Sequence, residues 1–131
     1  QIIKKGHWIT DQMNQELKEF GMTEPQYNVL RILKGAKGKP VSVQTILENM
    51  VQRSSNVTRI VDKLLVKGYV NRQECPTNRR KMDITITEEG VKILKNLDKK
   101  VHAFHAPLMD RLNEKELSTL KNLIIKLTIN D

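Results

Sequence analysis

Apolar residues recur at helical spacing through most of this 131-residue chain, and one internal segment departs from that spacing. In residues 69–87 the pattern shifts towards alternation, so that Met82, Ile84 and Ile86 fall on one face of an extended strand. A polar, basic stretch at 76–80 separates this strand from the one before it. The segment therefore predicts one β-hairpin within a chain that is otherwise expected to be α-helical.

Polar caps and glycines divide the rest of the chain into helices, four before the hairpin and two after it. Side-chain oxygens suit a helix start because they accept hydrogen bonds from its free backbone N–H groups. The predicted caps are Thr23 with Gln26 as its capping-box partner, Ser42, Ser54 or Ser55, Thr87, and Asn113 with Glu116. The predicted helix ends are Gly21, Gly35 and Gly68. Pro107 is expected to kink or interrupt the long helix that follows the hairpin.

The first helix and the last two helices are more apolar than the small middle unit can cover. On the long helix, the stripe has the spacing of a helix that packs on another helix: Leu94, Leu97, Val101, Phe104 and Leu108. The simplest way to bury such stripes is against a second copy of the chain, and a two-fold dimer is the commonest arrangement. We therefore expect a homodimer.

Two short predicted helices meet at residues 51–53, which leave room only for a tight corner. Two short helices joined in this way, with polar residues at the start of the second, match the helix-turn-helix of DNA-binding proteins. In that geometry the start of the second helix faces base edges in the major groove. The predicted base-facing residues are Ser54, Ser55, Asn56, Thr58 and Arg59, and the predicted backbone contacts are Gln52 and Arg53.

The basic charge of the chain gathers in the same region. Lys and Arg number 23 against 15 Asp and Glu, for a formal net charge of +8, and the sequence pI is about 9.7. Residues 51–81 contain eight basic side chains and two acidic ones, and so hold six of the eight surplus charges. The hairpin tip, Asn78, Arg79, Arg80 and Lys81, is suited to the narrow and strongly negative minor groove. Double-stranded DNA is therefore the predicted partner.

Three other classes of protein share parts of this pattern. An enzyme would need a Gly-rich phosphate loop, a nucleophile elbow or an acid–base set, and the sequence contains none, so neither enzymatic activity nor a cofactor is expected. A membrane-surface protein would need an amphipathic helix with a basic face, whereas the basic residues here lie in a turn, a helix start and a hairpin. A winged helix that binds only proteins would usually lose the basic tip that Arg79 and Arg80 provide.

Four segments of the sequence resemble the MarR family of bacterial regulators (multiple antibiotic resistance regulators). They are SNVTRIVDKL at 55–64, KGYVNR at 67–72, NRR at 78–80 and ITITEEG at 84–90. These segments correspond to the recognition helix, the first wing strand, the wing tip and the last wing strand leading into the long helix. The resemblance implies a winged helix-turn-helix DNA-binding domain at 23–87, flanked by dimerisation helices at 1–22 and 88–131.

The resemblance also implies a mode of action. Members of the family bind pseudo-palindromic operators as homodimers, usually as repressors, and a small molecule, a metal or an oxidant can release the DNA. The arginine that enters the minor groove corresponds to Arg79, and the base contacts correspond to residues 54–59. One position departs from the family pattern, because Asn78 stands where an Asp usually precedes the paired arginines. An Asp can brace an arginine by a salt bridge, whereas an Asn offers only a neutral hydrogen bond.

The single cysteine, Cys75, lies at the end of the first wing strand. It leaves no internal disulfide to form, which fits a reducing compartment. We expect a packed and inert thiol, because reactivity requires a lowered pKa. No apolar run approaches the ~20 residues that span a membrane, and no signal-peptide pattern is visible. The chain is therefore expected to be soluble, cytoplasmic and without a membrane partner.

Two further groups of side chains are candidates for sensing an effector. The first group is His7, His102 and His105. Three histidines can hold zinc, but no Cys or acidic ligands accompany these at a recognisable spacing, so solvated histidines are favoured and no metal is expected. The second group is Trp8, Met13, Phe20 and Phe104. These side chains line either a pocket for a small effector, which the resemblance allows, or the core, and the core is favoured.

Overall fold

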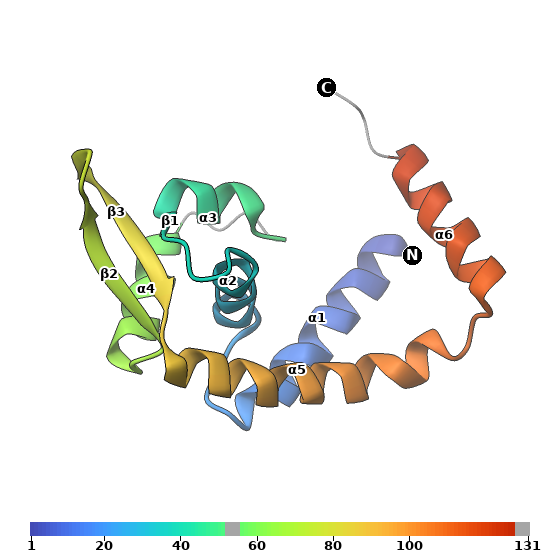
Figure 1. Ribbon diagram of the computed structural model, residues 1–131. Coiled ribbons are helices and arrows are strands. Elements are labelled where there is room, and N and C mark those ends of the chain that lie inside the picture. The colour runs from blue at the N-terminus through green and yellow to red at the C-terminus, as the bar shows by residue number, and fades with distance from the viewer. Residues whose placement is uncertain (52–55, 128–131) are drawn as a thin grey trace.

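The computed structural model describes residues 1–51 and 56–127, apart from the side chain of Arg79. Within these ranges the elements are α1 (Ile2–Lys18), α2 (Glu24–Gly35), β1 (Val41–Ser42), α3 (Val43–Asn49), α4 (Val57–Val66), β2 (Val70–Cys75), β3 (Asn78–Ile86), α5 (Glu88–Met109) and α6 (Glu114–Leu127). This order confirms the predicted fold, mainly α with one hairpin, and adds the short strand β1. Figure 1 shows the hairpin at one end of the long α5, with α1 crossing the middle of α5 and α6 rising from its far end.

Polar caps fix where most of the helices begin. The Thr23 hydroxyl accepts a hydrogen bond from the Gln26 backbone at 3.4 Å, and Gln26 Oε1 accepts one from the Thr23 backbone at 3.1 Å. Asn113 and Glu116 form the same reciprocal pair at 2.8 and 3.1 Å. The other predicted caps within the described ranges are also in place: Ser42 and Thr87. These starts are set by local sequence, which is why they could be predicted.

Two predicted helix boundaries differ from the structure. Helix α4 begins at Val57 with Asn56 in the N-cap position, later than predicted. The residues predicted to cap it, Ser54 and Ser55, lie outside the described residues. Helix α5 is not interrupted at Pro107 but continues to Met109. Pro107 lacks the N–H that would bond the carbonyl of Ala103, and the helix ends two residues beyond it.

The wing is a three-stranded antiparallel sheet in the order β1-β3-β2. Strands β2 and β3 pair as far as Cys75 and Asn78 at the tip. The turn therefore consists of residues 76–77 alone, and residues 78–80, which were predicted to lie in the tip between the strands, belong to β3. The pairing is irregular just before the tip, because the register passes from Glu74 with Met82 to Cys75 with Asn78, and residues 79–81 have no paired position on β2.

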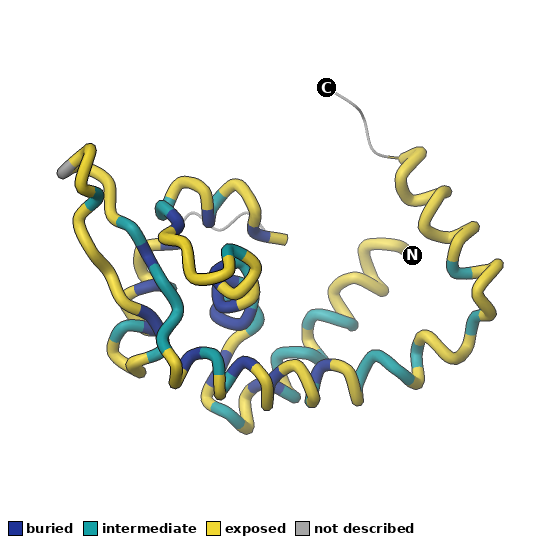
Figure 2. Tube along the Cα trace, in the orientation of Figure 1, coloured by how far each residue is buried: buried dark blue, intermediate teal, exposed yellow. Residues whose placement is uncertain are grey.

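The core lies in the unit formed by α2, α3, α4 and the sheet, which we call the central lobe, and it continues beneath the first half of α5. Fully buried side chains come from most of these elements and include Leu30, Leu33, Ile46, Leu64, Ile84 and Leu97. In contrast, α1 buries only Leu17, and none of the residues of α6 is buried. Figure 2 shows this division between the lobe and the exposed outer helices. No helix in the described ranges is long and apolar enough to cross a membrane.

Gly90 allows the first turn of α5 to lie directly against the base of the wing. A Cβ at this position would overlap the carbonyl oxygen of Tyr69 and would stand 2.7 Å from Cγ1 of Ile86. The residue that caps α5, Thr87, donates its hydroxyl to the carbonyl of Gly68 at 2.7 Å. These contacts fix the direction in which α5 leaves the central lobe.

Candidate nucleic-acid interface

Helices α3 and α4 pack against each other as the two helices of a helix-turn-helix. Val57, Val61 and Leu64 are the buried residues of α4, and Ile46 is the buried residue of α3. The spacing of three and four residues puts the apolar side chains of α4 on one face. The opposite face of α4 therefore carries its polar residues and stays exposed.

Three of the residues predicted to meet DNA lie at the start of this exposed face. Asn56, Thr58 and Arg59 are exposed, at the N-cap and in the first turn of α4. The free N–H groups and the positive end of the helix dipole favour an anion at this end of the helix. The other predicted residues of this segment lie outside the described residues: Gln52, Arg53, Ser54 and Ser55.

The start of β3 carries the basic residues of the wing. Arg80 and Lys81 are exposed, and the backbone of Arg79 is part of the same strand. Oδ1 of Asn78 accepts a hydrogen bond from the backbone N–H of Arg80 at 3.0 Å. The asparagine that replaces the usual acid therefore stabilises the backbone of the wing just beyond the turn.

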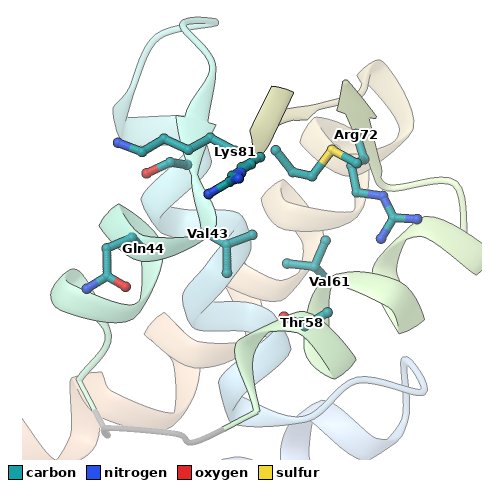
Figure 3. Close-up of a pocket in the computed structure, with 9 residues that line it drawn as sticks. Val43, Gln44, Thr58, Val61, Arg72 and Lys81 are labelled. Carbon is teal, nitrogen blue, oxygen red and sulfur yellow. The ribbon is translucent and has the colours of Figure 1, made fainter. Parts of the chain in front are cut away.

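Helices α3 and α4 and the wing surround a hollow of about 340 Å³. Figure 3 shows Val43 of α3 near Thr58 and Val61 of α4, with Arg72 and Lys81 contributed by the strands. The other lining residues are Ser42, Gln44, Arg80 and Met82. The lining thus combines apolar side chains with three basic ones. The hollow brings α4 and the wing together in one basic surface.

Arg72 belongs to this surface, although the sequence analysis assigned it no individual role. It lies on β2, and its Nη1 stands 2.9 Å from Oδ1 of Asp62 on α4. Both side chains are about half exposed, and an ion pair of this kind usually contributes only ~0–1 kcal/mol to stability. Its effect here is geometric, since it joins β2 to α4. Only the way β2 folds back along α4 brings the two charges together, and no local sequence pattern reveals that.

Cys75 is half-buried at the end of β2, so the thiol expected to be packed is packed only in part. Its Sγ lies 3.3 Å from the Thr77 hydroxyl oxygen. Hydrogen bonds from the side chain and then the backbone of Thr77 lower the pKa of the Cys75 thiol. A hydrogen-bond donor has this effect because it stabilises the thiolate more than the thiol.

The four side chains proposed for an effector pocket differ in their burial. The rings of Trp8 and Phe104 are 6.4 Å apart at their centroids, and Trp8 is 46% exposed. Met13 and Phe20 are partly buried against the core. Met13 and Phe20 thus pack beside the core, whereas Trp8 lies at the surface.

The three histidines are not grouped as a metal site. Among the residues that the structure describes, no cluster of three or more His, Cys, Asp or Glu side chains is placed to hold a metal ion. His7 and His102 are exposed, and His105 lies beside Phe104 with ring centroids 5.2 Å apart. A single chain therefore offers no constellation suited to zinc within the described ranges.

These elements define a class of fold, the winged helix-turn-helix, here extended by long helices at both ends of the chain. Solved structures share this fold. A MarR-like transcription regulator from Bacillus cereus has a TM-score of 0.84 at 23% identity, over 95% of this chain and 88% of that chain. A mutant MarR from E. coli, complexed with operator DNA, has a TM-score of 0.85 at 23% identity, over 98% of this chain and 91% of that chain.

Sequence comparison finds a family model and several relatives. The MarR family model matches residues 22–82. The HTH-type transcriptional regulator MhqR of Bacillus subtilis is 27% identical over 122 residues, which cover 93% of this chain and 83% of MhqR. The transcriptional repressor MprA of Escherichia coli K12 is 24% identical over 119 residues, 91% of this chain and 68% of MprA. The chain thus resembles the MarR family over residues 22–82 and HTH-type transcriptional regulators over most of its length, in agreement with the resemblance seen in its sequence.

Proposed function

We propose that this protein is a repressor that binds a pseudo-palindromic operator as a homodimer, and that a small effector controls its release from DNA. The observation that carries the proposal is the basic surface on which α4 and the wing meet around the hollow in Figure 3. Helix α4 presents Asn56, Thr58 and Arg59 to solvent, and β3 presents Arg80 and Lys81. A helix of this kind fits the major groove, and a basic wing fits the minor groove beside it.

Each part of the surface is proposed to have its own task. Arg59 can pair with a guanine and Asn56 with an adenine, because each offers two hydrogen-bonding atoms that match one base edge. Thr58, with Ser54 and Ser55 in the same segment, donates to bases or phosphates. The backbone contacts are assigned to the turn, Gln52 and Arg53. The minor-groove contact is assigned to Arg79, with Asn78, Arg80 and Lys81 beside it.

The names of several relatives support a role on DNA. MprA is a transcriptional repressor. Solved structures with the same fold include MarR from E. coli complexed with operator DNA and a MepR–DNA complex from S. aureus. The MepR chain has a TM-score of 0.85 at 20% identity, over 96% of this chain and 91% of that chain. This agreement in fold is consistent with the placement of α4 and the wing proposed above.

The exposed apolar side chains of the outer helices support the homodimer. On α6 they are Leu120, Leu123, Ile124, Ile125 and Leu127, and on α1 they are Ile2, Ile3 and Trp8. An apolar surface of this extent usually marks an interface, and a two-fold axis lets one self-complementary surface cover itself. We therefore assign residues 1–22 and 88–131 to dimerisation and residues 23–87 to DNA binding. The effector is proposed to bind where the partner chain would cover the exposed ring of Trp8 beside Phe104.

The proposal is tested by measuring binding to duplex DNA. The probe is DNA from immediately upstream of the protein's own gene, with a scrambled duplex as control, followed by fluorescence anisotropy at several salt concentrations. We expect a dimer per duplex, a steep fall in affinity with salt, and a preference of about a thousandfold or more for the specific sequence. Where the upstream DNA is not the operator, selection from a random duplex library supplies one. A selection that enriches no sequence would contradict the proposal and favour a winged helix that binds proteins.

Base reading and backbone contact can be separated by substitution. Asn56→Ala and Arg59→Ala are each expected to reduce the preference for operator over random DNA, by about ten- to hundredfold, because a base-reading pair is lost. Lys63→Ala, on the exposed face of the same helix, serves as the contrast. It should weaken binding to both DNAs alike and reduce the slope with salt. An unchanged specificity ratio in the first two variants would remove their base-reading role.

A further inference from the structure

Tyr27 joins the central lobe to the long helix through its hydroxyl group. It lies on α2, is 4% exposed, and donates a hydrogen bond to Oδ1 of Asp98 on α5 at 2.6 Å. The same hydroxyl oxygen accepts a hydrogen bond from Nη1 of Arg31 at 3.2 Å. A contact of this length to a carboxylate is among the stronger hydrogen bonds in proteins, and it is directional.

Tyr27 and Asp98 belong to parts of the molecule with different proposed tasks. Helix α2 packs on α4, the recognition helix, and also on α5. Helix α5 leaves the base of the wing and runs towards the proposed dimer interface (Figure 1). Two residues beyond Asp98, Lys100 pairs with Glu19 at 3.0 Å and with Glu16 at 3.4 Å, both at the end of α1. One stretch of α5 is thus bonded to the lobe through Tyr27 and to the outer helix α1 through Lys100.

The surroundings keep the Tyr27 hydroxyl in the state that can donate. Burial, followed by the hydrogen bond to Asp98, raises the pKa of Tyr27, and Arg31 acts in the opposite direction. The guanidinium of Arg31 lies 5.8 Å from the centroid of the Tyr27 ring and so holds the ring as well as the hydroxyl. The apolar contacts between α2 and α5 have little directional preference. A buried, directional hydrogen bond therefore restricts how the lobe is rotated on α5.

We propose that Tyr27 and Asp98 are positioning residues that set the angle of each DNA-binding lobe on α5, and thereby the half-site spacing that the dimer accepts. The inference rests on the proposed function, since only a dimer on a two-fold operator has a spacing to set. In such a dimer the two recognition helices enter the major groove about one helical turn apart. An inserted base pair turns one half-site by about 35° relative to the other. A lobe held firmly on α5 resists that rotation.

The test measures spacing preference and not affinity alone. Wild type, Tyr27→Phe and Tyr69→Phe are each titrated against the operator that wild type selects and against the same operator with an inserted central base pair. Tyr69→Phe is the matched control, because no hydrogen bond is found for the Tyr69 hydroxyl within the described part of the chain. We expect the ratio of the two affinities to fall by about fivefold in Tyr27→Phe, the factor expected for one lost hydrogen bond, and to stay unchanged in Tyr69→Phe.

Substitutions at Asp98 distinguish a positioning role from a general loss of stability. Asp98→Ala should reduce the spacing ratio as much as Tyr27→Phe, and combining the two changes should add little, since both remove the same bond. Asp98→Asn keeps an acceptor for the tyrosine and should restore most of the ratio. A normal ratio in Tyr27→Phe, with a clear ratio in wild type, would overturn this inference and leave the proposed function intact. A wild-type protein indifferent to spacing would overturn both.

Discussion

The central lobe and α6 carry the same kind of apolar pattern, but they differ completely in burial. In the lobe, Leu30 and Leu64 are fully buried, whereas on α6 Leu120 is 46% exposed and Leu127 is 67% exposed. Helical spacing tells which face of a helix is apolar and not what covers that face. The lobe is covered by its own chain, and α6 requires another surface. A sequence therefore does not distinguish a stripe that enters the internal core from one that enters an assembly interface. The fold makes the distinction, because it shows which apolar stripes stay exposed.

The largest expected effect is at the point where α5 leaves the central lobe. Gly90→Ala places a methyl group against the Tyr69 carbonyl and Ile86, and we expect a loss of about 3 kcal/mol or more in the free energy of unfolding. Gly6→Ala is the matched control, because no atom lies within 4 Å of the added Cβ. Alanine also favours a helix over glycine by about 0.5–1 kcal/mol. Urea unfolding followed by circular dichroism distinguishes the two, and equal stabilities would show that α5 can move off the wing.

A charge on α6 is expected to disrupt the proposed homodimer and to leave the central lobe folded. Leu120→Lys puts a charge on the exposed apolar face of α6. We expect a monomer whose unfolding temperature no longer depends on protein concentration. Loss of two-site binding should weaken operator affinity by about a hundredfold or more. Leu30→Ala gives the contrasting result, since a core cavity costs about 2–5 kcal/mol at every concentration. Light scattering that still shows a dimer for Leu120→Lys would exclude α6 from the interface.

A third substitution does the reverse and removes DNA binding without touching the assembly. Arg79→Ala deletes the proposed minor-groove contact and is expected to cost about 1–3 kcal/mol in operator binding. Dimer mass and unfolding temperature should not change. Arg111→Ala, in the exposed connection between α5 and α6, removes the same charge away from the lobe and should leave affinity unaltered. Equal affinities in the two variants would mean that the wing does not bind as proposed.

The parts of the fold that could be predicted are those fixed by local sequence. Thr23 with Gln26, and Asn113 with Glu116, cap their helices through residues three positions apart, so the signal lies within one turn. Strand β1 was missed because its two residues become a strand only by pairing with β3. The extent of β3 was underestimated for a similar reason, since Asn78 joins the strand by pairing with Cys75 across an irregularity in the register, which no local propensity indicates.

The candidate site divides in the same way. Asn56, Thr58 and Arg59 follow from the order of two short helices and the polar start of the second. The Asp62–Arg72 pair and the Tyr27–Asp98 bond were not predicted, because they join positions 10 and 71 residues apart. Such contacts depend on how neighbouring elements pack, which a single sequence does not encode in any short pattern.

The smallest expected effect concerns the bond that joins the lobe to α5. Because burial and Asp98 raise the pKa of Tyr27, the folded protein favours the neutral hydroxyl more than the unfolded chain does. The stability that this group contributes is therefore fully present below the unfolded pKa of about 10, and it is lost as the pH rises through the folded pKa. Relative to Tyr27→Phe, wild type should be more stable by about 1 kcal/mol at neutral pH, and this advantage should shrink in urea titrations above about pH 10.

Comparing wild type with Tyr27→Phe cancels the contributions of all other titratable groups, because both proteins contain them. The Tyr69 hydroxyl has no hydrogen-bond partner among the described residues. Wild type should therefore have no such stability advantage over Tyr69→Phe. If the difference between wild type and Tyr27→Phe stayed constant with pH, the hydroxyl would not be a buried donor, and the lobe would be held on α5 by apolar packing alone. If the stability difference shrank as expected, a polar and directional hydrogen bond would join the central lobe to α5. This contact would differ from the apolar and non-directional packing that stabilises the lobe itself and that we propose for the dimer interface.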